Sequence, residues 1–530
     1  GIMVFPTLDT IANAATPSIL NAVFRDAPKR NKPSEASNAD NYDCPLDIGI
    51  PTASRENRLF GSFNDLFSRP LAIVGNTGSG KSYSVARLLQ SAIEQVGEAK
   101  FPRFFVLDIN GEYGRAFGVD GKEAKQPDKI FLNGKEFSIP IWLMNAHEVC
   151  EWLSAAEQTQ EPVLKNSWSL LKGATIAPDL SKGKLANRCL GIVRKLPDVA
   201  NGSGNARQST VLEWDAFKAY AANVDLTDEM SGLIDQMDAI QGQLKASLQQ
   251  SYPPWAIGDE RQQIEEIASS LAHCFEAFSS EEINLSQESA DKPIYFPLSQ
   301  LRSDPLSVAA SSEDDGRLRQ FLMSLQLRLD NRLADKRWGS FINYDDIGIN
   351  SFESWVEKFG VGAEGRSINV IDCSMLGHEV LPYVCGIIGR MLLETRERQV
   401  AGDRFKEPWV IVLEEAHNYV RPPRQDEDRG SKISREAFER IAKEGRKFGM
   451  SLIVASQRPS EISQTIISQC ANFIMHRLQN PNDIDHFKSI IPVQSRRLLD
   501  QISVLVSGEA ITFGSAFHVP SRVQIHSPKN

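Results

Sequence analysis

The stretch Leu-Ala-Ile-Val-Gly-Asn-Thr-Gly-Ser-Gly-Lys-Ser, residues 71–82, decides the fold of this 530-residue chain. Four apolar residues end at a glycine-rich turn, and residues 83–93 then carry apolar side chains at helical spacing. A strand, a loop and a helix therefore follow one another. A second apolar run, 104–108, comes after the helix, and this alternation predicts a parallel α/β sheet.

The turn matches the pattern G-x-x-x-x-G-K-[ST] in full. Its glycines let backbone N–H groups surround a phosphate chain, and the helix N-terminus adds positive charge. We expect ATP to bind through eight consecutive residues: Gly75, Asn76, Thr77, Gly78, Ser79, Gly80, Lys81 and Ser82. Lys81 is expected to reach the β- and γ-phosphates, and the Ser82 hydroxyl to coordinate Mg²⁺.

Other apolar runs end in the polar groups that phosphoryl transfer needs. The run 409–413 is followed by two carboxylates, of which Glu414 is expected to hold Mg²⁺ and Glu415 to polarise the attacking water. This order departs from the commoner Asp-Glu. Gln457 follows a later run and is placed to sense the γ-phosphate. Asp108, at the end of the second strand, fits a further catalytic carboxylate and a turn residue equally well.

Residues 434–448 are expected to form a helix that carries a basic stripe. The stripe consists of Arg435, Arg440, Lys443, Arg446 and Lys447. Such a stripe is typical of a solvated face that pairs with its own glutamates. The alternative makes Arg446 an arginine finger that acts on the nucleotide of a neighbouring subunit.

The pattern along the chain predicts four segments. Residues 1–55 are read as an N-terminal segment with a linker, 56–145 and 336–530 as the two parts of an α/β core, and 146–335 as a helical insertion. Because the chain begins with Gly, we expect it to be partial or processed. The second part of the core should contain strands at 367–373, 409–413, 451–455 and 504–513 and a helix at 381–399. Helices of the insertion are expected at 147–156, 233–248, 261–278 and 317–333.

Composition limits the function classes. The net charge of −10 and the pI near 5.5 exclude a protein that coats nucleic acid with its whole surface. The seven scattered cysteines contain no Cys-x-x-Cys pair and favour reduced thiols in the cytoplasm. No apolar run approaches the length of a membrane span. No histidine has metal-ligand company, and His417 is expected to pack behind the acidic strand.

Taken together, the motifs resemble the HerA branch of the HerA/FtsK ATPases over about residues 56–526. The resemblance rests on six stretches in this order: 75–82, 108–113, 413–417, 444–449, 456–459 and 508–520. It implies a RecA-like P-loop core with a large inserted helical subdomain, a homo-hexameric ring and a double-stranded DNA translocase activity. It also implies that Arg446 acts in trans and that Arg69 is a second arginine near the subunit boundary. The family's N-terminal barrel is not complete here, and residues 4–6 are a candidate for its tail.

The leading hypothesis is an ATP- and Mg²⁺-dependent DNA motor that serves with a nuclease or sirtuin-like effector, in anti-phage defence rather than repair. The candidates for pore contacts to DNA are Lys488, Arg496 and Arg497 in the polar segment 480–497. For each of them a solvated surface position is at least as good an interpretation as a DNA contact. In a ring, six copies of a few basic residues would converge despite the acidic average. The alternatives are a DNA end-resection motor, a pump for another polymer, and a nucleotide-gated ring that clusters an effector enzyme.

Overall fold

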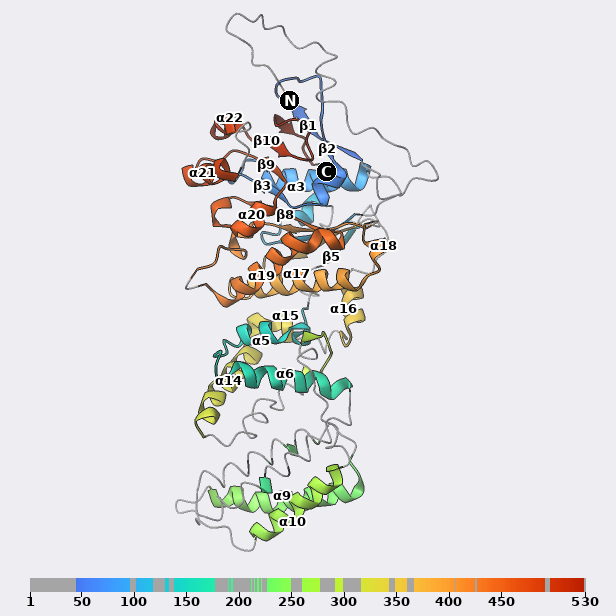
Figure 1. The fold of residues 1–530 in the computed structure, drawn as a ribbon, viewed down its shortest axis with the longest axis vertical. Helices are drawn as coiled ribbons and strands as arrows, with labels where there is room; N and C mark the ends of the chain where they lie inside the picture. The colour runs from blue at the N-terminus through green and yellow to red at the C-terminus, as the bar shows by residue number, and fades with distance from the viewer. Residues whose placement is uncertain are drawn as a thin grey trace, which may run out of the picture. The chain divides into compact units, whose positions relative to one another are not determined.

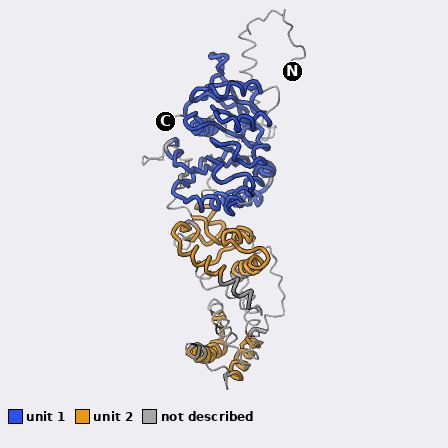
Figure 2. Tube along the Cα trace, turned by 90° about the vertical axis from the view of Figure 1, so that its left-hand side faces the viewer, with its two compact units in different colours: residues 1–137, 362–530 blue, residues 138–361 orange. Residues whose placement is uncertain are grey.

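The computed structural model describes the residues 44–95, 102–117, 129–132, 138–176, 226–248, 260–276, 291–298, 316–342, 348–359, 367–405, 407–424, 427–490 and 496–528, and single positions between 189 and 221. It divides the chain into two compact units (Figure 2). Unit 1 combines Gly1–Phe137 with Gly362–Asn530, and unit 2 is Ser138–Val361. Unit 2 is therefore longer at both ends than the expected insertion 146–335.

Unit 1 is built on an 11-stranded sheet with the order β2-β1-β11-β10-β9-β3-β8-β7-β4-β6-β5 (Figure 1). Its strands are β1 (Pro45–Pro51), β2 (Leu59–Ser62), β3 (Leu71–Val74), β4 (Arg103–Asp108), β5 (Lys129–Leu132), β6 (Ser367–Asp372), β7 (Trp409–Leu413), β8 (Met450–Ser456), β9 (Asn472–Met475), β10 (Glu509–Gly514) and β11 (Ser521–Ile525). The strands from β9 to β5 pair in parallel, and those from β2 to β9 pair antiparallel.

The helices of unit 1 follow the strands as the alternation predicts. They are α2 (Phe63–Phe67), α3 (Lys81–Gln95), α4 (Tyr113–Ala116), α17 (Leu381–Arg398), α18 (Ala401–Arg404), α19 (Arg429–Glu444), α20 (Gln464–Gln469), α21 (Pro481–Ile490) and α22 (Arg496–Leu499). Short 3-10 turns are η4 (Ala416–Asn418), η5 (Gly445–Phe448), η6 (Pro459–Glu461) and η8 (Ile502–Val504).

Helices cover both faces of the parallel part of the sheet. Alternate strand residues such as Ile73 and Ile453 pack into one core with α2 and α3. On the opposite face, the guanidinium of Arg396 in α17 lies 4.8 Å from the ring centroid of Trp409 in β7. Because both faces are covered, β3, β4, β7 and β8 are buried along their whole length. The α/β expectation is thus confirmed as a RecA-like core.

Two expectations near the sheet edge need correction. The predicted strand 504–513 is a strand only from Glu509, and η8 occupies its beginning, because Gly508 turns the backbone with φ +81°. At the other end of the chain, β1 pairs with β11 and so lies in the core sheet, ahead of the expected start at residue 56. The rest of the N-terminal segment, residues 1–43 with the barrel-tail candidate 4–6, lies outside the described residues.

Unit 2 is helical in the part that the structure describes. Its elements are η2 (Ile141–Leu143), α5 (Ala146–Trp152), α6 (Glu161–Ile176), α9 (Asp228–Leu248), α10 (Glu260–Glu276), α14 (Gly316–Ala334), η3 (Lys336–Trp338), α15 (Gly339–Ile342) and α16 (Phe352–Lys358). Trp152 and Trp338 meet edge to face at 5.7 Å between ring centroids. The buried ammonium of Lys172 donates to the carbonyl oxygens of Met144 and Lys292, both at 2.7 Å.

Candidate functional site

The phosphate loop joins β3 to α3 at the carboxyl end of the parallel strands. Gly78 and Gly80 have φ of +73° and +108°, a region that only glycine enters at no steric cost. A Cβ at Gly75 would lie 2.5 Å from the Cβ of His476, so this glycine is required by close packing. The loop is therefore shaped by its glycines, as expected for a cradle of backbone N–H groups.

Two distant segments hold the loop from outside. The Asn76 N–H donates to the Arg477 carbonyl at 2.9 Å, and the Gly508 N–H donates to the Ser79 carbonyl at 2.9 Å. The Ser507 hydroxyl donates to the Gly78 carbonyl at 3.1 Å. Sequence reasoning missed these supports, since no local signal links residues so far apart in the chain.

His476 lies beneath the loop and is fully buried. Its Nδ1 lies 2.8 Å from the Glu509 carbonyl oxygen and its Nε2 lies 2.8 Å from the Ser84 hydroxyl. Because a carbonyl can only accept, Nδ1 carries the proton and Nε2 accepts from Ser84. Burial, opposed by the Glu509 carbonyl and assisted by the charge of Lys81, lowers the pKa of His476 to about 4.

Lys81 and Glu415 form a buried ion pair between Nζ and Oε1. The other oxygen, Oε2, accepts from the backbone N–H of Gln457 at 3.2 Å and lies 3.3 Å from the Nδ1 of His417. Burial alone would raise the pKa of Glu415, but the partners His417 and Lys81 outweigh it and lower the pKa to about 2. Glu415 is thus ionised at neutral pH and fixed at the end of β7. His417 is buried in η4, which follows β7, and its Nδ1 also lies 3.0 Å from the Ser456 hydroxyl.

Glu414, by contrast, lies in surroundings that favour its neutral form. Its side chain is buried, and neither carboxyl oxygen has a hydrogen-bond partner among the described residues. Burial, and then the negative charge of Asp108, raise the pKa of Glu414 to about 9. The two adjacent carboxyls differ because Glu415 adopts a left-handed backbone, with φ 41° and ψ 47°, which changes the direction of the chain between them. Such strain is common at functional sites.

Gln457 and Asp108 also lie at this edge of the sheet. The Thr77 hydroxyl donates to the Gln457 side-chain oxygen at 2.6 Å, which links the glutamine to the phosphate loop. The carboxylate of Asp108 accepts from the backbone N–H groups of Gly111, Glu112 and Tyr113 at 2.8–3.2 Å. These bonds fit the second of the two roles expected for Asp108, that of a turn residue. Its negative charge also raises the pKa of Glu414.

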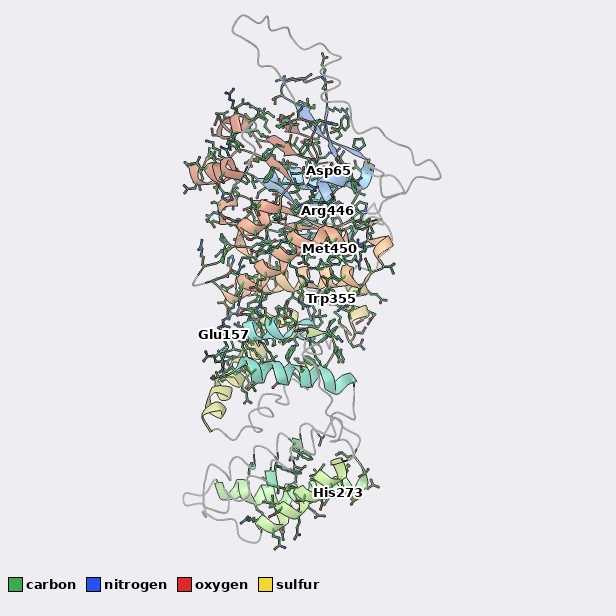
Figure 3. The ribbon with its side chains drawn as sticks, viewed as in Figure 1. Asp65, Glu157, His273, Trp355, Arg446 and Met450 are labelled. Atoms are coloured by element: carbon green, nitrogen blue, oxygen red, sulfur yellow. The ribbon has the colours of Figure 1, made fainter. Side chains whose placement is uncertain are left out.

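Arg446 and Arg69 lie at the other end of the same strands. Arg446 precedes β8 and Arg69 precedes β3, whereas Gln457 and the phosphate loop follow them. The seven residues of β8 extend about 20 Å at ~3.3 Å per residue, more than an arginine side chain can bridge. Figure 3 labels Arg446 near Met450, the first residue of β8. The structure therefore does not bring the two arginines to the phosphate loop of their own chain.

The basic stripe, which runs along α19 and into η5, separates into paired and unpaired members. Within the helix, Arg435 lies 3.6 Å from Glu439 and Arg440 lies 3.8 Å from Glu444, the kind of pairing expected. Their shorter ion pairs go to residues outside the helix, Glu427 at 2.9 Å and Glu397 at 2.6 Å, and the Arg435 side chain is only 12% exposed. Arg446 is exposed and has no ion pair or hydrogen bond from its side chain within the described part of the chain. Among the arginines of the stripe, Arg446 is thus the one whose side chain is exposed without a partner among the residues that the structure describes.

The basic candidates for DNA contact lie in the segment between β9 and β10. Lys488 of α21 is 39% exposed in its side chain and lies 3.8 Å from Asp485 and 3.9 Å from Asp500. Arg496 and Arg497, the first residues of α22, are exposed. Both ends of this segment contact the phosphate loop, at Arg477 and at Ser507.

The residues fit a magnesium nucleotide. The glycine loop and Lys81 suit a triphosphate, and the buried Glu414 carboxyl, unpartnered within the part of the chain that the structure describes, suits a hydrated divalent cation. Among the described residues, no group of three or more His, Cys, Asp or Glu side chains can hold a metal unaided. The cation would therefore share its ligands with phosphate oxygens and water, as is usual for Mg²⁺.

The fold and the site define the chain as a P-loop nucleoside triphosphatase with a RecA-like sheet. Residues 46–250 match the family described as "Helicase HerA, central domain". "Probable helicase MJ1565" of Methanocaldococcus jannaschii is 33% identical over 160 residues, 30% of either protein. "DNA double-strand break repair helicase HerA" of Pyrococcus furiosus is 32% identical over 189 residues, 31% of this chain and 33% of that protein. The chain is thus similar to HerA-type helicases, over residues 46–250 for the family model.

The matched part spans about a third of the length of these curated relatives. Among solved structures, VirB4 of Thermoanaerobacter pseudethanolicus is similar with a TM-score of 0.38 and 14% identity, over 91% of this chain and 96% of that one. Within the described residues, no helix is both long and apolar enough to cross a membrane. The seven cysteines are free thiols.

Proposed function

We propose that the chain is an ATP-driven, Mg²⁺-dependent double-stranded DNA translocase that works as a homo-hexameric ring. The observation that carries the proposal is the separation of Arg446 from Lys81 and Glu415 by the length of β8. One chain holds a phosphate loop and a poised carboxylate, but its Arg446 and Arg69 lie at the opposite end of the strands. A neighbouring copy, placed head to tail, supplies the missing cation.

Each residue at the loop has a separate task in this proposal. Lys81 neutralises the β- and γ-phosphates, and Ser82 and Glu414 hold the magnesium ion, which supplies charge stabilisation to the transferring phosphoryl group. Glu415, ionised and fixed by its neighbours, accepts a proton from the attacking water. Gln457, tied to Thr77, orients that water. Arg446 or Arg69 of the next copy neutralises the transition state.

The segment between β9 and β10 is the proposed link from nucleotide to DNA. Its ends contact the phosphate loop at Arg477 and Ser507, so a shift of the loop on phosphate binding reaches both ends. It also carries the exposed Arg496 and Arg497. In a ring, six copies of these cations converge on the DNA backbone, while the average charge of −10 keeps the exterior acidic.

The wider role of the motor is part of the same proposal. We place the motor in the cytoplasm and propose that it serves in anti-phage defence with a nuclease or sirtuin-like effector. The helical unit 2 gives such an effector a surface in addition to the ATPase core. DNA end resection in repair is the nearest alternative. A ring that only clusters an effector is separated from the motor by Glu415→Gln, because a scaffold would keep its biological activity without ATP turnover.

Mixing two inactive variants tests the arrangement. Lys81→Ala lacks the phosphate contact and Arg446→Ala lacks the arginine, and we expect each alone to lose at least about 10³-fold in ATP hydrolysis. In a mixed ring, a Lys81→Ala chain can lie next to an Arg446→Ala chain. The site between them is complete when the first chain supplies its intact Arg446 and the second supplies its intact Lys81. Duplex-stimulated ATP hydrolysis should therefore return on mixing.

The matched control is a mixture of Lys81→Ala with Glu415→Gln. Both changes lie on the phosphate-loop side of the same site, so one side of every interface stays defective and no activity should return. Recovery in this control, or none in the first mixture, would contradict the trans arrangement. Hydrolysis by the wild-type chain that ignores linear duplex DNA would contradict the DNA motor.

A further inference from the structure

A cavity of about 420 Å³ opens on the face of unit 1 that carries Arg446. Its walls are mostly apolar, and they include Phe63, Phe67, Phe405, Pro408 and Met450. A water molecule occupies about 30 Å³, so the cavity is large enough for one or two apolar side chains. Phe405 is 49% exposed, which leaves an aromatic ring facing solvent at this site.

The cavity lies on the same face as the two arginines. Arg446 contributes to its wall, and so does Ser68, which directly precedes Arg69 in the chain. Because β8 separates this face from the phosphate loop of the same chain, a trans role of Arg446 brings the cavity against the phosphate loop of another copy. Whatever surrounds that loop is then what meets the cavity.

Exposed apolar side chains lie in the helix that follows the phosphate loop and in the segment that leads to Ser507. Tyr83, one residue after Ser82, is 68% exposed, and Val504 and Val506 are 66% and 57% exposed. Val506 directly precedes Ser507, which donates a hydrogen bond to the loop. These three residues, Tyr83, Val504 and Val506, are called the collar below.

We propose that the cavity beside Arg446 receives the collar of a second copy of this chain. The occupant follows from complementarity, because an open apolar cavity on one face and exposed apolar side chains on the other are both covered by a single head-to-tail contact. The contact would also fix the approach of Arg446 to the neighbouring phosphates. This contact rests on the proposed function, in which copies of the chain form a ring, and it is the surface through which neighbouring copies would bind each other.

Sedimentation of the full chain with Mg²⁺ and a non-hydrolysable ATP analogue tests this contact. Ser68→Trp fills the cavity, and Phe405→Asp places a charge on its exposed wall. A collar variant carries serine at Tyr83, Val504 and Val506. We expect each to weaken self-association at least about tenfold, as for the loss of a central interface anchor. Leu327→Asp, at a 61% exposed apolar site in unit 2, is the matched control and should assemble as the wild type does.

An equimolar mixture of Phe405→Asp and the collar variant gives the sharpest result. The first keeps an intact collar and the second an intact cavity, so the mixture should form heterodimers with one good interface and no rings. Monomers alone, with both variants folded by circular dichroism, would overturn the proposal, as would wild-type assembly in both cavity variants. A wild-type chain that forms cavity-dependent rings but does not hydrolyse ATP would refute the proposed function and leave this contact standing.

Discussion

Replacing His476 by Phe should make the stability of unit 1 less dependent on acid. The histidine is neutral in the fold, with a pKa of about 4 against an ordinary value of 6.5. Below pH 6.5 the unfolded chain binds a proton that the folded chain does not, so stability falls as the pH falls from about 6.5 to about 4. At 1.36 kcal/mol per pKa unit, the wild type should lose about 2 kcal/mol between pH 7.5 and pH 5 from this group.

The phenylalanine variant has no such group, but it loses two hydrogen bonds. The Ser84 hydroxyl and the Glu509 carbonyl would remain buried without their partner, which costs about 2–4 kcal/mol at pH 7.5. Urea unfolding of both chains at each pH should therefore show a large gap at pH 7.5 that shrinks by about 2 kcal/mol at pH 5. His518→Phe, at an exposed site, controls for changes elsewhere. A gap that stays constant or widens in acid would refute the reasoning.

Three further outcomes are expected. Gly449→Ala should lower the free energy of unfolding by more than about 2 kcal/mol, seen in thermal melts, because Gly449 has φ +66° and a Cβ would lie 2.3 Å from the Arg404 carbonyl oxygen. Arg446→Ala should leave the melting temperature within about 1 °C of the wild type while it abolishes hydrolysis, because the side chain is exposed; a large loss of stability would argue for a structural role. His417→Ala should lower kcat about tenfold or more with little change in the KM for ATP, because His417 orients Glu415; an effect on KM alone would contradict this.

The sequence was sufficient for those parts of the fold in which one strand and its loop carry the signal. The run 409–413 coincides with β7, and residues 71–82 form the expected strand and phosphate loop. Periodicity is a local property, and here the buried parallel strands are continuous apolar runs. The strand expected at 504–513 was too long because Val504 and Val506 are apolar but exposed, and periodicity does not distinguish a core residue from an exposed one.

The support of the loop could not be predicted for a different reason. His476 and Gly508 lie close to the loop only because β9 pairs with β3 and β10 pairs with β9. The order of strands in a sheet cannot be deduced from any single segment of sequence. The different pKa values of Glu414 and Glu415 also depend on tertiary neighbours, Asp108 for one and Lys81 for the other. The two adjacent glutamates look equivalent in the sequence, but their side chains lie in different electrostatic environments.

The two oxygens of Glu415 suggest how phosphate binding and water activation are coupled. Oε1 pairs with Lys81, whereas Oε2 is held by the Gln457 N–H and lies beside His417. A γ-phosphate in the loop competes for the same ammonium group, and a phosphate carries more charge than a carboxylate. Lys81 should then leave Oε1 while the contacts at Oε2 keep the carboxylate in place. In the proposed mechanism, Glu415 would thus be freed to accept the proton from water only when the phosphate to be attacked is bound. The His417→Ala variant tests the contact at Oε2, which stays fixed.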